Sequence, residues 1–220
     1  MLYLYIFSHS RQLSKEESNK LLDFIKEEKL KDILSYKNIY IRQKHLLGHI
    51  FPKMLIALLT KLKYEDIRIR KNKYGKPLSE LFYFNISYSE DYIVCVISNK
   101  RVGIDIEKVE KNIENLIPFF TLKEQEYINK YNKNKEIITG LWTLKESYIK
   151  QVGKGLYIPL NSFEIIPENE KNYFKKGKYI FIQMQLGKAI FISICSYYKK
   201  IEKIDYLNLE DFFNILNSVK

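Results

Sequence analysis

Long apolar runs are missing from this 220-residue sequence, and none approaches the roughly 18 residues that a membrane-spanning helix needs. The first residues, MLYLYIF, lack the basic segment and the small-residue cleavage site of a secretory leader. We therefore expect no membrane anchor, and we expect the protein to be cytoplasmic.

Cysteine is also scarce, with two residues in the chain. Cys95 lies in YIVCVIS and Cys195 lies in FISICS. A thiol within such an apolar run behaves as a small core side chain. We expect both cysteines to be reduced and structural.

Negative charge is in deficit, because 37 Lys and Arg residues exceed 26 Asp and Glu residues and give a net charge of +11. A field of this sign favours anionic partners such as nucleic acid, nucleotides, phosphorylated cofactors or an acidic protein. The lysines are scattered, and no helix-turn-helix, zinc-finger or RNP pattern is visible. A basic nucleic-acid-binding module is therefore an alternative that the pattern disfavours.

A repeated strand pattern is present instead. Residues 82–98, FYFNISYSEDYIVCVIS, predict a hairpin with its turn at Ser89 to Asp91. Residues 179–196 repeat that design around Gly187. Two similar hairpins about a hundred residues apart predict two similar α+β halves, residues 1–100 and 101–220.

Helix signals occupy the segments between these strands. Ser14 and Glu17 fit a capping box that opens a helix over about residues 15–34. A second periodic stretch, residues 39–62, predicts a helix that Pro52 kinks or divides. Residues 136–151 and 209–217 predict two more helices.

VGIDIE, residues 102–107, places two carboxylates on one predicted strand. Asp105 and Glu107 project from the same face about 6.6 Å apart, where they can share a hard cation such as Mg²⁺. Alternating acidic and apolar residues are also what any solvated strand face shows. Taken alone, the strand pattern favours that simpler explanation.

Two further acidic residues have structural explanations as well. In GLWTLKESYIK, Glu146 and Lys150 are spaced as an ordinary surface pair on a helix. In FFTLKE, Thr121 and Glu124 fit a second capping box. Each motif by itself leaves both catalysis and structure open.

In this order, however, the motifs resemble the signature of the 4′-phosphopantetheinyl transferases, specifically the Sfp-like branch that activates peptide and polyketide synthases. They are G-I-D-I-E, F-T-x-x-E and W-T-L-K-E-S-x-x-K-x-x-G-K-G-L. The resemblance extends from LSKEE, HLLG, YGKP and FNIS upstream to GKGLYIPLNSFEI downstream. It implies an α+β pseudo-dimer with coenzyme A and Mg²⁺ at the interface, in agreement with the two predicted halves.

The resemblance implies transfer of 4′-phosphopantetheine from coenzyme A to a serine of an acyl, peptidyl or aryl carrier protein, with release of 3′,5′-ADP. Asp105, Glu107 and Glu146 are implied as ligands of Mg²⁺, with Mn²⁺ as an alternative. Glu124 is implied as the general base, acting directly or through water, and Lys150 as a positive charge beside the phosphates. Carrier proteins are commonly acidic, which suits the basic chain, and a monomer is expected from the internal pseudo-symmetry of the family.

Coenzyme A contacts are implied for a set of positions, which are Lys29, Lys31, Lys44, His45, Lys76, Pro77, Ser87, Tyr88 and Lys145. The sequence departs from the family at Asp32, where a lysine is expected, and at Tyr88, where the family usually has histidine. Tyr88 would donate a neutral hydrogen bond in place of a charge-assisted one, which weakens selection for the 3′-phosphate.

Carrier contacts are predicted for the apolar residues after the metal strand, above all Ile113 and Leu116. For Phe119 and Phe120, a place in the core is an equally supported alternative. A coenzyme A- or carrier-binding relative that performs no transfer is a further alternative for the whole chain.

Overall fold

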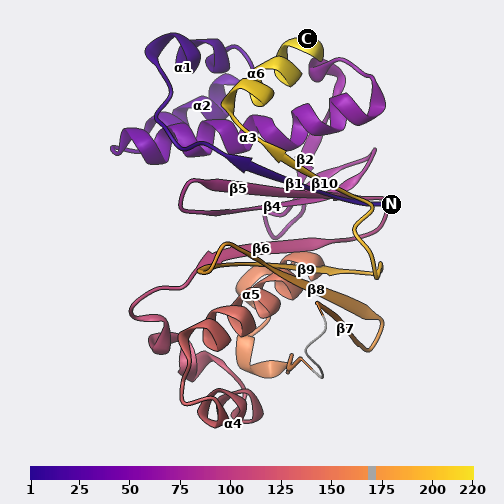
Figure 1. Cartoon of the computed structure of the whole chain (residues 1–220). Coiled ribbons are helices and arrows are strands. Elements are labelled where there is room, and N and C mark those ends of the chain that lie inside the picture. The colour runs from indigo at the N-terminus through magenta and orange to yellow at the C-terminus, as the bar shows by residue number, and fades with distance from the viewer. Residues whose placement is uncertain (168–171) are drawn as a thin grey trace.

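The structure is a computed structural model that describes residues 1–167 and 172–220. Figure 1 shows four stacked layers, which are helices, a sheet, a second sheet and further helices. Aliphatic side chains from the facing sides of the two sheets form a core between them. Further cores lie between each sheet and its helices, so both faces of each sheet are covered.

The upper half in Figure 1 contains a four-stranded sheet in the order β10-β1-β5-β4. Its strands are β1 (Leu2–Ser8), β4 (Tyr83–Ser89), β5 (Tyr92–Ser98) and β10 (Lys203–Leu207). Its helices are α1 (Lys15–Leu22), α2 (Glu27–Leu34), α3 (Ile39–Thr60) and α6 (Leu209–Ser218). A separate ribbon consists of β2 (Ile69–Lys71) and β3 (Pro77–Ser79).

The lower half contains a second four-stranded sheet in the order β6-β9-β8-β7. Its strands are β6 (Gly103–Lys108), β7 (Tyr173–Lys176), β8 (Tyr179–Leu186) and β9 (Ile190–Ser196). Its helices are α4 (Leu122–Lys130) and α5 (Lys135–Val152). Short 3₁₀ helices cover Tyr64–Asp66, Ile113–Phe119, Gly155–Tyr157 and Leu160–Ser162.

The two halves repeat one arrangement of a strand, a covering helix and an antiparallel hairpin. In the first half these are β1, α3 and the hairpin β4–β5, and in the second they are β6, α5 and the hairpin β8–β9. In both halves the first strand pairs antiparallel with the last strand of the hairpin. This repeat confirms the predicted α+β pseudo-dimer and both predicted hairpins.

The end of the described chain returns to the first sheet. β10 pairs in parallel with β1, and α6 packs into the same core as α3. The chain passes from β5 of the first sheet to β6 of the second at residues 99–102. The division into residues 1–100 and 101–220 stays a prediction, and the return of β10 and α6 adds a third segment to it.

One helix prediction requires correction, and one of two alternatives for another is excluded. The helix predicted over residues 15–34 is two helices, and the break between them lets Phe24 pack edge-on against Tyr64, with 5.1 Å between ring centroids. Ser14 caps α1 through the predicted capping box. Pro52 does not divide α3, because its neighbours are buried and packing holds the helix through the one hydrogen bond that proline cannot donate, whereas a kink at Pro52 stays a prediction.

Both cysteines are buried and unpaired, as predicted. Cys95 lies in the core above the first sheet, and Cys195 lies in the core beneath the second. Among the described residues, no helix combines the length and apolar character needed to cross a membrane.

Candidate active site

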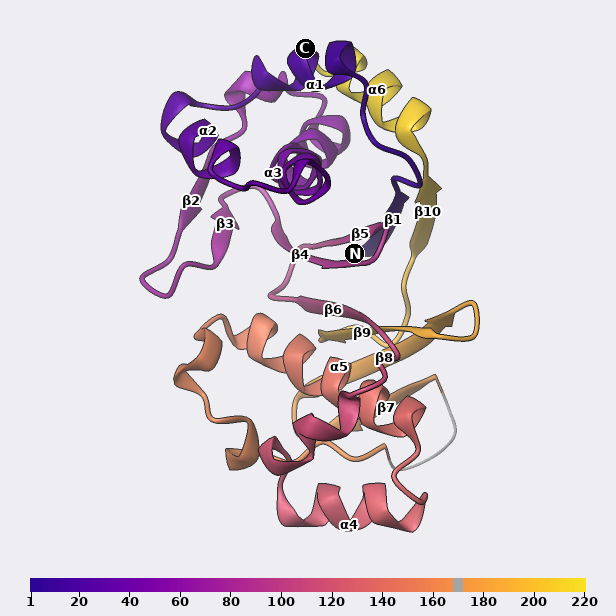
Figure 2. The ribbon, with the colours of Figure 1, turned by 90° about the vertical axis from the view of Figure 1, so that its left-hand side faces the viewer.

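The predicted metal-binding residues lie where the two halves meet. Figure 2 shows β4 of the first sheet facing β6 of the second, with α5 on the other side of β6. Ser87 comes from β4, Asp105 from β6 and Lys150 from α5. The three side chains therefore come from two strands and a helix that belong to different halves.

Gly103 makes the close approach of β6 to α5 possible. A Cβ atom at this position would lie 2.1 Å from the carbonyl oxygen of Ser147 and 2.3 Å from the backbone nitrogen of Gln151. A glycine permits such an approach of backbone to backbone because it has no side chain. The close packing brings Asp105 within reach of Lys150.

Asp105 is the centre of a buried polar cluster. Its Oδ1 accepts hydrogen bonds from Lys150 Nζ at 2.6 Å and from Ser87 Oγ at 2.9 Å, and Lys150 Nζ also donates to Ser87 Oγ at 2.8 Å. Burial raises the pKa of the Asp105 carboxyl, and Lys150 opposes that rise. Oδ2 is buried and has no hydrogen-bond partner among the described residues, so one acceptor of the cluster is left over.

Glu107 and Glu146 are the other two carboxylates of the predicted metal site. Burial and then the charge of Asp105 raise the pKa of both, that of Glu107 to about 7. Both features fit a hard cation. Its charge would relieve the repulsion between the carboxylates, and the unpartnered Oδ2 of Asp105 would be one of its ligands. Across residues 1–167 and 172–220, however, no three acidic, His or Cys side chains converge as a formed metal site.

The raised pKa of Glu107 predicts a pH dependence of stability. Its ordinary pKa is 4.5 and its pKa in the folded chain is about 7, so folding favours the protonated form. The resulting stability is fully present below pH 4.5 and is lost as the pH rises through about 7. Between pH 5 and pH 8 without divalent cations, we expect the unfolding free energy of the unmodified chain to fall by on the order of 2 kcal/mol more than that of Glu107→Gln.

Urea unfolding of both proteins at several pH values measures this difference. Glu114→Gln is the matched control, because Glu114 is an exposed carboxylate that follows the same strand. Equal pH slopes for the unmodified chain and Glu107→Gln would contradict the prediction.

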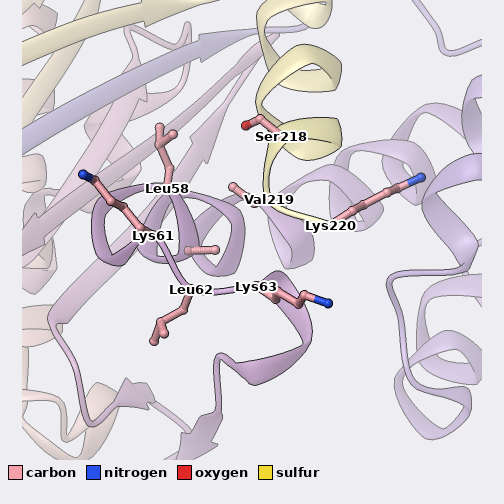
Figure 3. Close-up of a pocket in the computed structure, with 8 residues that line it drawn as sticks. Leu58, Lys61, Leu62, Lys63, Ser218, Val219 and Lys220 are labelled. Atoms are coloured by element: carbon pink, nitrogen blue, oxygen red, sulfur yellow. The ribbon is translucent and has the colours of Figure 1, made fainter.

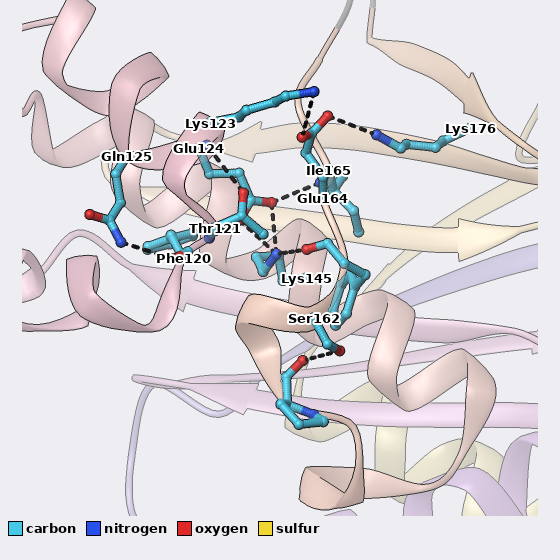
Figure 4. A network of polar contacts seen from close by, with 12 residues as sticks. Phe120, Thr121, Lys123, Glu124, Gln125, Lys145, Ser162, Glu164, Ile165 and Lys176 are labelled. Carbon is cyan, nitrogen blue, oxygen red and sulfur yellow. Dashed lines mark hydrogen bonds and ion pairs between the residues drawn. The ribbon is translucent and has the colours of Figure 1, made fainter.

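Glu124 and Lys145 form a second cluster, drawn in Figure 4. Glu124 and Thr121 make the predicted capping box, which is therefore confirmed. Glu124 also pairs with Lys145 Nζ at 2.7 Å, and both side chains are 0% exposed. The implied roles of Glu124 as a base and of Lys145 as a ligand contact stay predictions, because neither side chain reaches the surface in this structure.

Tyr88 and His45 lie on the helix side of the first sheet. Successive residues of a strand face opposite sides, so Ser87 faces β6 while Tyr88 faces α3. A Cβ atom at Gly48 would lie 2.2 Å from the Tyr88 hydroxyl oxygen, and burial raises the pKa of that hydroxyl. His45 stacks on Tyr36, with 4.4 Å between ring centroids, and its ring centroid lies 5.9 Å from that of Tyr88.

Each of the predicted lysines of the first half has a partner within the protein. Lys29 is near enough to His45 to lower its pKa, although burial of the imidazole is the larger cause. Lys31 pairs with Glu27 on the exposed side of α2, at 3.3 Å. Lys44 donates to the carbonyl oxygen of Glu90 at 2.7 Å, on the turn between β4 and β5. Lys29 itself pairs with Asp32 at 3.2 Å, and the charge of Lys44 also lowers the pKa of His45, so the contacts of these lysines with coenzyme A stay predictions.

Lys76 joins the two halves. Its Nζ donates to the carbonyl oxygens of Val102, at 3.0 Å, and of Lys150. Burial lowers the pKa of Lys76 to about 8. The next residue, Pro77, begins β3. The ammonium group therefore binds protein backbone, and its implied contact with coenzyme A stays a prediction.

Asn72 is a junction residue that sequence reasoning missed. Its Nδ2 donates to the carbonyl oxygen of Gly153 at 2.9 Å, and its Oδ1 accepts from the backbone N–H groups of Tyr74 and Lys76. Gly75 follows with a φ of +87°. The turn-forming sequence N-K-Y-G was the available signal, because asparagine side chains hydrogen-bond to backbone two residues ahead and glycine permits a positive φ.

The predicted carrier contacts differ in their exposure and stay predictions. Ile113 is 7% exposed and packs in a small core with Phe120 and Ile128, so its burial favours a structural role over a carrier contact. Leu116 is only partly buried against that core. The exposed apolar side chains of this segment are Phe119 and Leu122.

Two cavities in the described chain lie away from the carboxylates. One, of about 320 Å³, lies where α3 and α6 end and is bordered by Lys61, Lys63 and Lys220 (Figure 3). The other, of about 400 Å³, lies between α1 and α6 in the first half. Neither is lined by a predicted site residue.

Fold and site together define a class of protein, a single chain of two repeated α+β halves with carboxylates and a lysine clustered at their junction. Residues 101–207 match the family described as the 4′-phosphopantetheinyl transferase superfamily. Over 218 residues the chain is 31% identical to the 4′-phosphopantetheinyl transferase gsp of Aneurinibacillus migulanus, which covers 96% of this chain and 92% of that protein.

Further relatives agree. The chain is 35% identical over 170 residues to the 4′-phosphopantetheinyl transferase Sfp of Bacillus subtilis strain 168, covering 74% of this chain and 75% of that protein. It is 31% identical over 146 residues to an L-aminoadipate-semialdehyde dehydrogenase-phosphopantetheinyl transferase of Mus musculus, covering 56% and 47%. The chain therefore belongs to the 4′-phosphopantetheinyl transferase superfamily, which confirms the resemblance seen in its motifs.

Proposed function

We propose that this chain transfers the 4′-phosphopantetheine group of coenzyme A to a serine of a carrier protein. The observation that carries the proposal is the cluster of Ser87, Asp105 and Lys150 at the junction of the halves, in a chain similar over nearly its whole length to a named transferase. The serine oxygen attacks the β-phosphorus, the bond from that phosphorus to the bridging oxygen breaks, and 3′,5′-ADP leaves with the electron pair. The serine proton passes to a base.

Asp105, Glu107 and Glu146 would hold a divalent cation, which we propose is Mg²⁺, with Mn²⁺ as the alternative. When bound, this cation supplies neutralisation of charge on the pyrophosphate oxygens. Lys150 would supply a second positive charge, and the Ser87 hydroxyl a hydrogen-bond donor, at the same phosphates. The support for this assignment is the unpartnered Oδ2 of Asp105 and the shared electrostatics of the three carboxylates.

The proposed partner is an apo carrier protein with an acidic surface, as in peptide or polyketide synthesis. The net charge of +11 supports electrostatic docking of such a partner. A monomer that acts in the cytoplasm is part of the same proposal. No observation favours the alternative of a nucleic-acid-binding module over this function.

Intact mass of apo carrier proteins, incubated with the chain, coenzyme A and Mg²⁺, tests the proposal directly. We expect a gain of about 340 Da, the transferred group, which disappears with a chelator and with Asp105→Ala. No gain on acyl, peptidyl and aryl carriers, despite binding of coenzyme A, would identify a relative that binds without transfer. If neither a mass gain nor binding of coenzyme A is found, the result would favour the alternative of a nucleic-acid-binding module.

Tyr88 leads to a prediction about the choice of coenzyme A. We expect the unmodified chain to discriminate weakly between coenzyme A and its 3′-dephospho form, because a neutral hydroxyl stands where the family has an imidazole. Tyr88→His is expected to raise the ratio of the two kcat/KM values about tenfold, through a charge-assisted hydrogen bond to the 3′-phosphate.

The control for this prediction is Tyr88→Phe, which keeps the ring against Gly48 and removes only the hydroxyl. A ratio that Tyr88→His leaves unchanged would count against a 3′-phosphate contact at this position. An effect of Tyr88→Phe equal to that of Tyr88→His would assign the change to packing.

A further inference from the structure

Every acceptor position of the Glu124 carboxylate is used within the protein (Figure 4). Oε1 accepts from the backbone N–H of Ile165 at 2.7 Å, and Oε2 accepts from the backbone N–H of Thr121 at 2.9 Å. Both oxygens also lie 2.7 Å from Lys145 Nζ. A general base must come within hydrogen-bond reach of the proton it takes, directly or through one water, and no oxygen of Glu124 is exposed to a serine or to such a water.

Lys145 is saturated in the same way. Its ammonium group donates to both oxygens of Glu124 and to the carbonyl oxygen of Phe163, at 2.6 Å. These contacts use the three donors that a lysine possesses. Nζ also lies 4.2 Å from the centroid of the Phe163 ring, whose face favours a cation. No donor is left for a phosphate.

The pair connects three segments that are distant in the sequence. Glu124 belongs to the first turn of α4, Lys145 to the middle of α5, and the backbone of Phe163 and Ile165 to the stretch that precedes β7. Ile165 continues into the core beneath the second sheet. The contacts therefore fix the position of α4 and of residues 163–165 against α5.

The same contacts determine the rotation of α5. Lys145 directly precedes Glu146, and successive residues of a helix point about 100° apart. Anchoring Lys145 on the α4 side therefore directs Glu146 and Lys150 to the side of Asp105, where Lys150 is found. A disturbed pair would misplace the carboxylate cluster without touching it.

The charged residues around the pair are satisfied separately. Glu164 faces outward and pairs with Lys176 at 3.3 Å and with Lys123 at 3.7 Å. These side chains remain partly exposed, whereas Glu124 and Lys145 are enclosed. The buried pair is thus a closed unit beside an ordinary surface pair.

We propose that Glu124 and Lys145 are a positioning pair, which holds α4, α5 and residues 163–165 around the carboxylate cluster, and that neither takes the proton of the acceptor serine. The inference rests on the proposed transferase function. On this proposal, Glu124 and Lys145 affect transfer through the orientation of α5. Another group at the junction accepts the proton of the serine.

A double-mutant cycle of Glu124→Gln and Lys145→Met separates positioning from proton transfer. Each single variant leaves a buried group without its partner, so we expect each to lower kcat/KM about 100-fold or more. The double variant removes both charges, and we expect its kcat/KM to recover to within about tenfold of the unmodified chain. We expect the fall of its kcat/KM at low pH, the acid limb of the pH profile, to be unchanged. Glu164→Gln with Lys176→Met is the matched control, and we expect near-normal activity.

A general base at Glu124 predicts the opposite result. The double variant would then be as inactive as Glu124→Gln, and its acid limb would be lost, which would overturn the proposal. Should the double variant not fold, Lys145→Met alone decides between the two roles. An acid limb that moves to higher pH would identify Glu124 as the base, whereas an acid limb at the same pH with a lower kcat supports positioning. Absence of transfer by the unmodified chain would overturn the proposed function instead. The same double-mutant cycle measured on unfolding free energies in urea would still report whether the stabilising effects of Glu124 and Lys145 depend on each other.

Discussion

Asp105→Asn is expected to lower kcat/KM for carrier modification at least about a thousand-fold, because it removes the charge at the centre of the site. The amide keeps the size of the carboxylate, so the loss isolates charge from shape. Lys150 and Ser87 would keep an amide oxygen as acceptor, but Lys150 would lose its counter-charge and the predicted cation would lose a charged ligand. The measurement is the rate of mass gain of an apo carrier, with coenzyme A binding followed separately.

The same substitution is expected to change the unfolding free energy by less than about 1 kcal/mol. Asp105 is buried at a cost that raises its pKa, and the side chain of Lys150 is 27% exposed, so water can take over the ammonium group. Glu114→Gln is again the control for loss of one carboxylate. Activity above about a tenth of normal would contradict the assigned role of Asp105.

Gly103→Ala is expected to lower the unfolding free energy by about 3 kcal/mol or more, and to abolish transfer with it. The added methyl group would collide with the backbone of α5 at Ser147 and Gln151, where no side chain can move aside. β6 would have to shift away from α5 and carry Asp105 with it. Urea unfolding and the carrier assay measure the two losses.

Gly140→Ala is the matched control, since Gly140 also lies in the lower half but inside α5. A Cβ atom there would have its closest neighbour, in the side chain of Gln183, at 3.4 Å, which is ordinary contact. Alanine also favours the helix by up to about 1 kcal/mol, so we expect unchanged or higher stability. Similar losses for Gly103→Ala and Gly140→Ala would contradict the close-approach explanation.

Local signals predicted the parts of the site that depend on local structure. The turn at Ser89 to Asp91 fixed the first hairpin, and the hydroxyl of Thr121 fixed the start of α4. Asp105 lies at the junction because Ile104 and Ile106 flank it in a strand that packs on both faces. These features need only near neighbours, which a pattern of residues contains.

Partners distant in the sequence could not be predicted in this way. A lysine within a helix is ordinarily exposed, and nothing near Lys145 announces that Glu124 encloses it. Lys76 binds carbonyl oxygens of the other half, and any backbone can offer those. Ile113 is apolar, and an apolar residue is as compatible with a small core as with a docking surface. Each of these outcomes depends on packing between elements.

The parallel pairing of β10 with β1 also orders the events of synthesis. Until residues 203–207 leave the ribosome, β1 is an edge strand with unpaired backbone groups, and the apolar surface that α6 covers is open. The second sheet has all its strands once residue 196 has emerged. The first sheet is therefore completed after the second as the chain is made, and until then the unpaired edge of β1 is open to pairing with another chain.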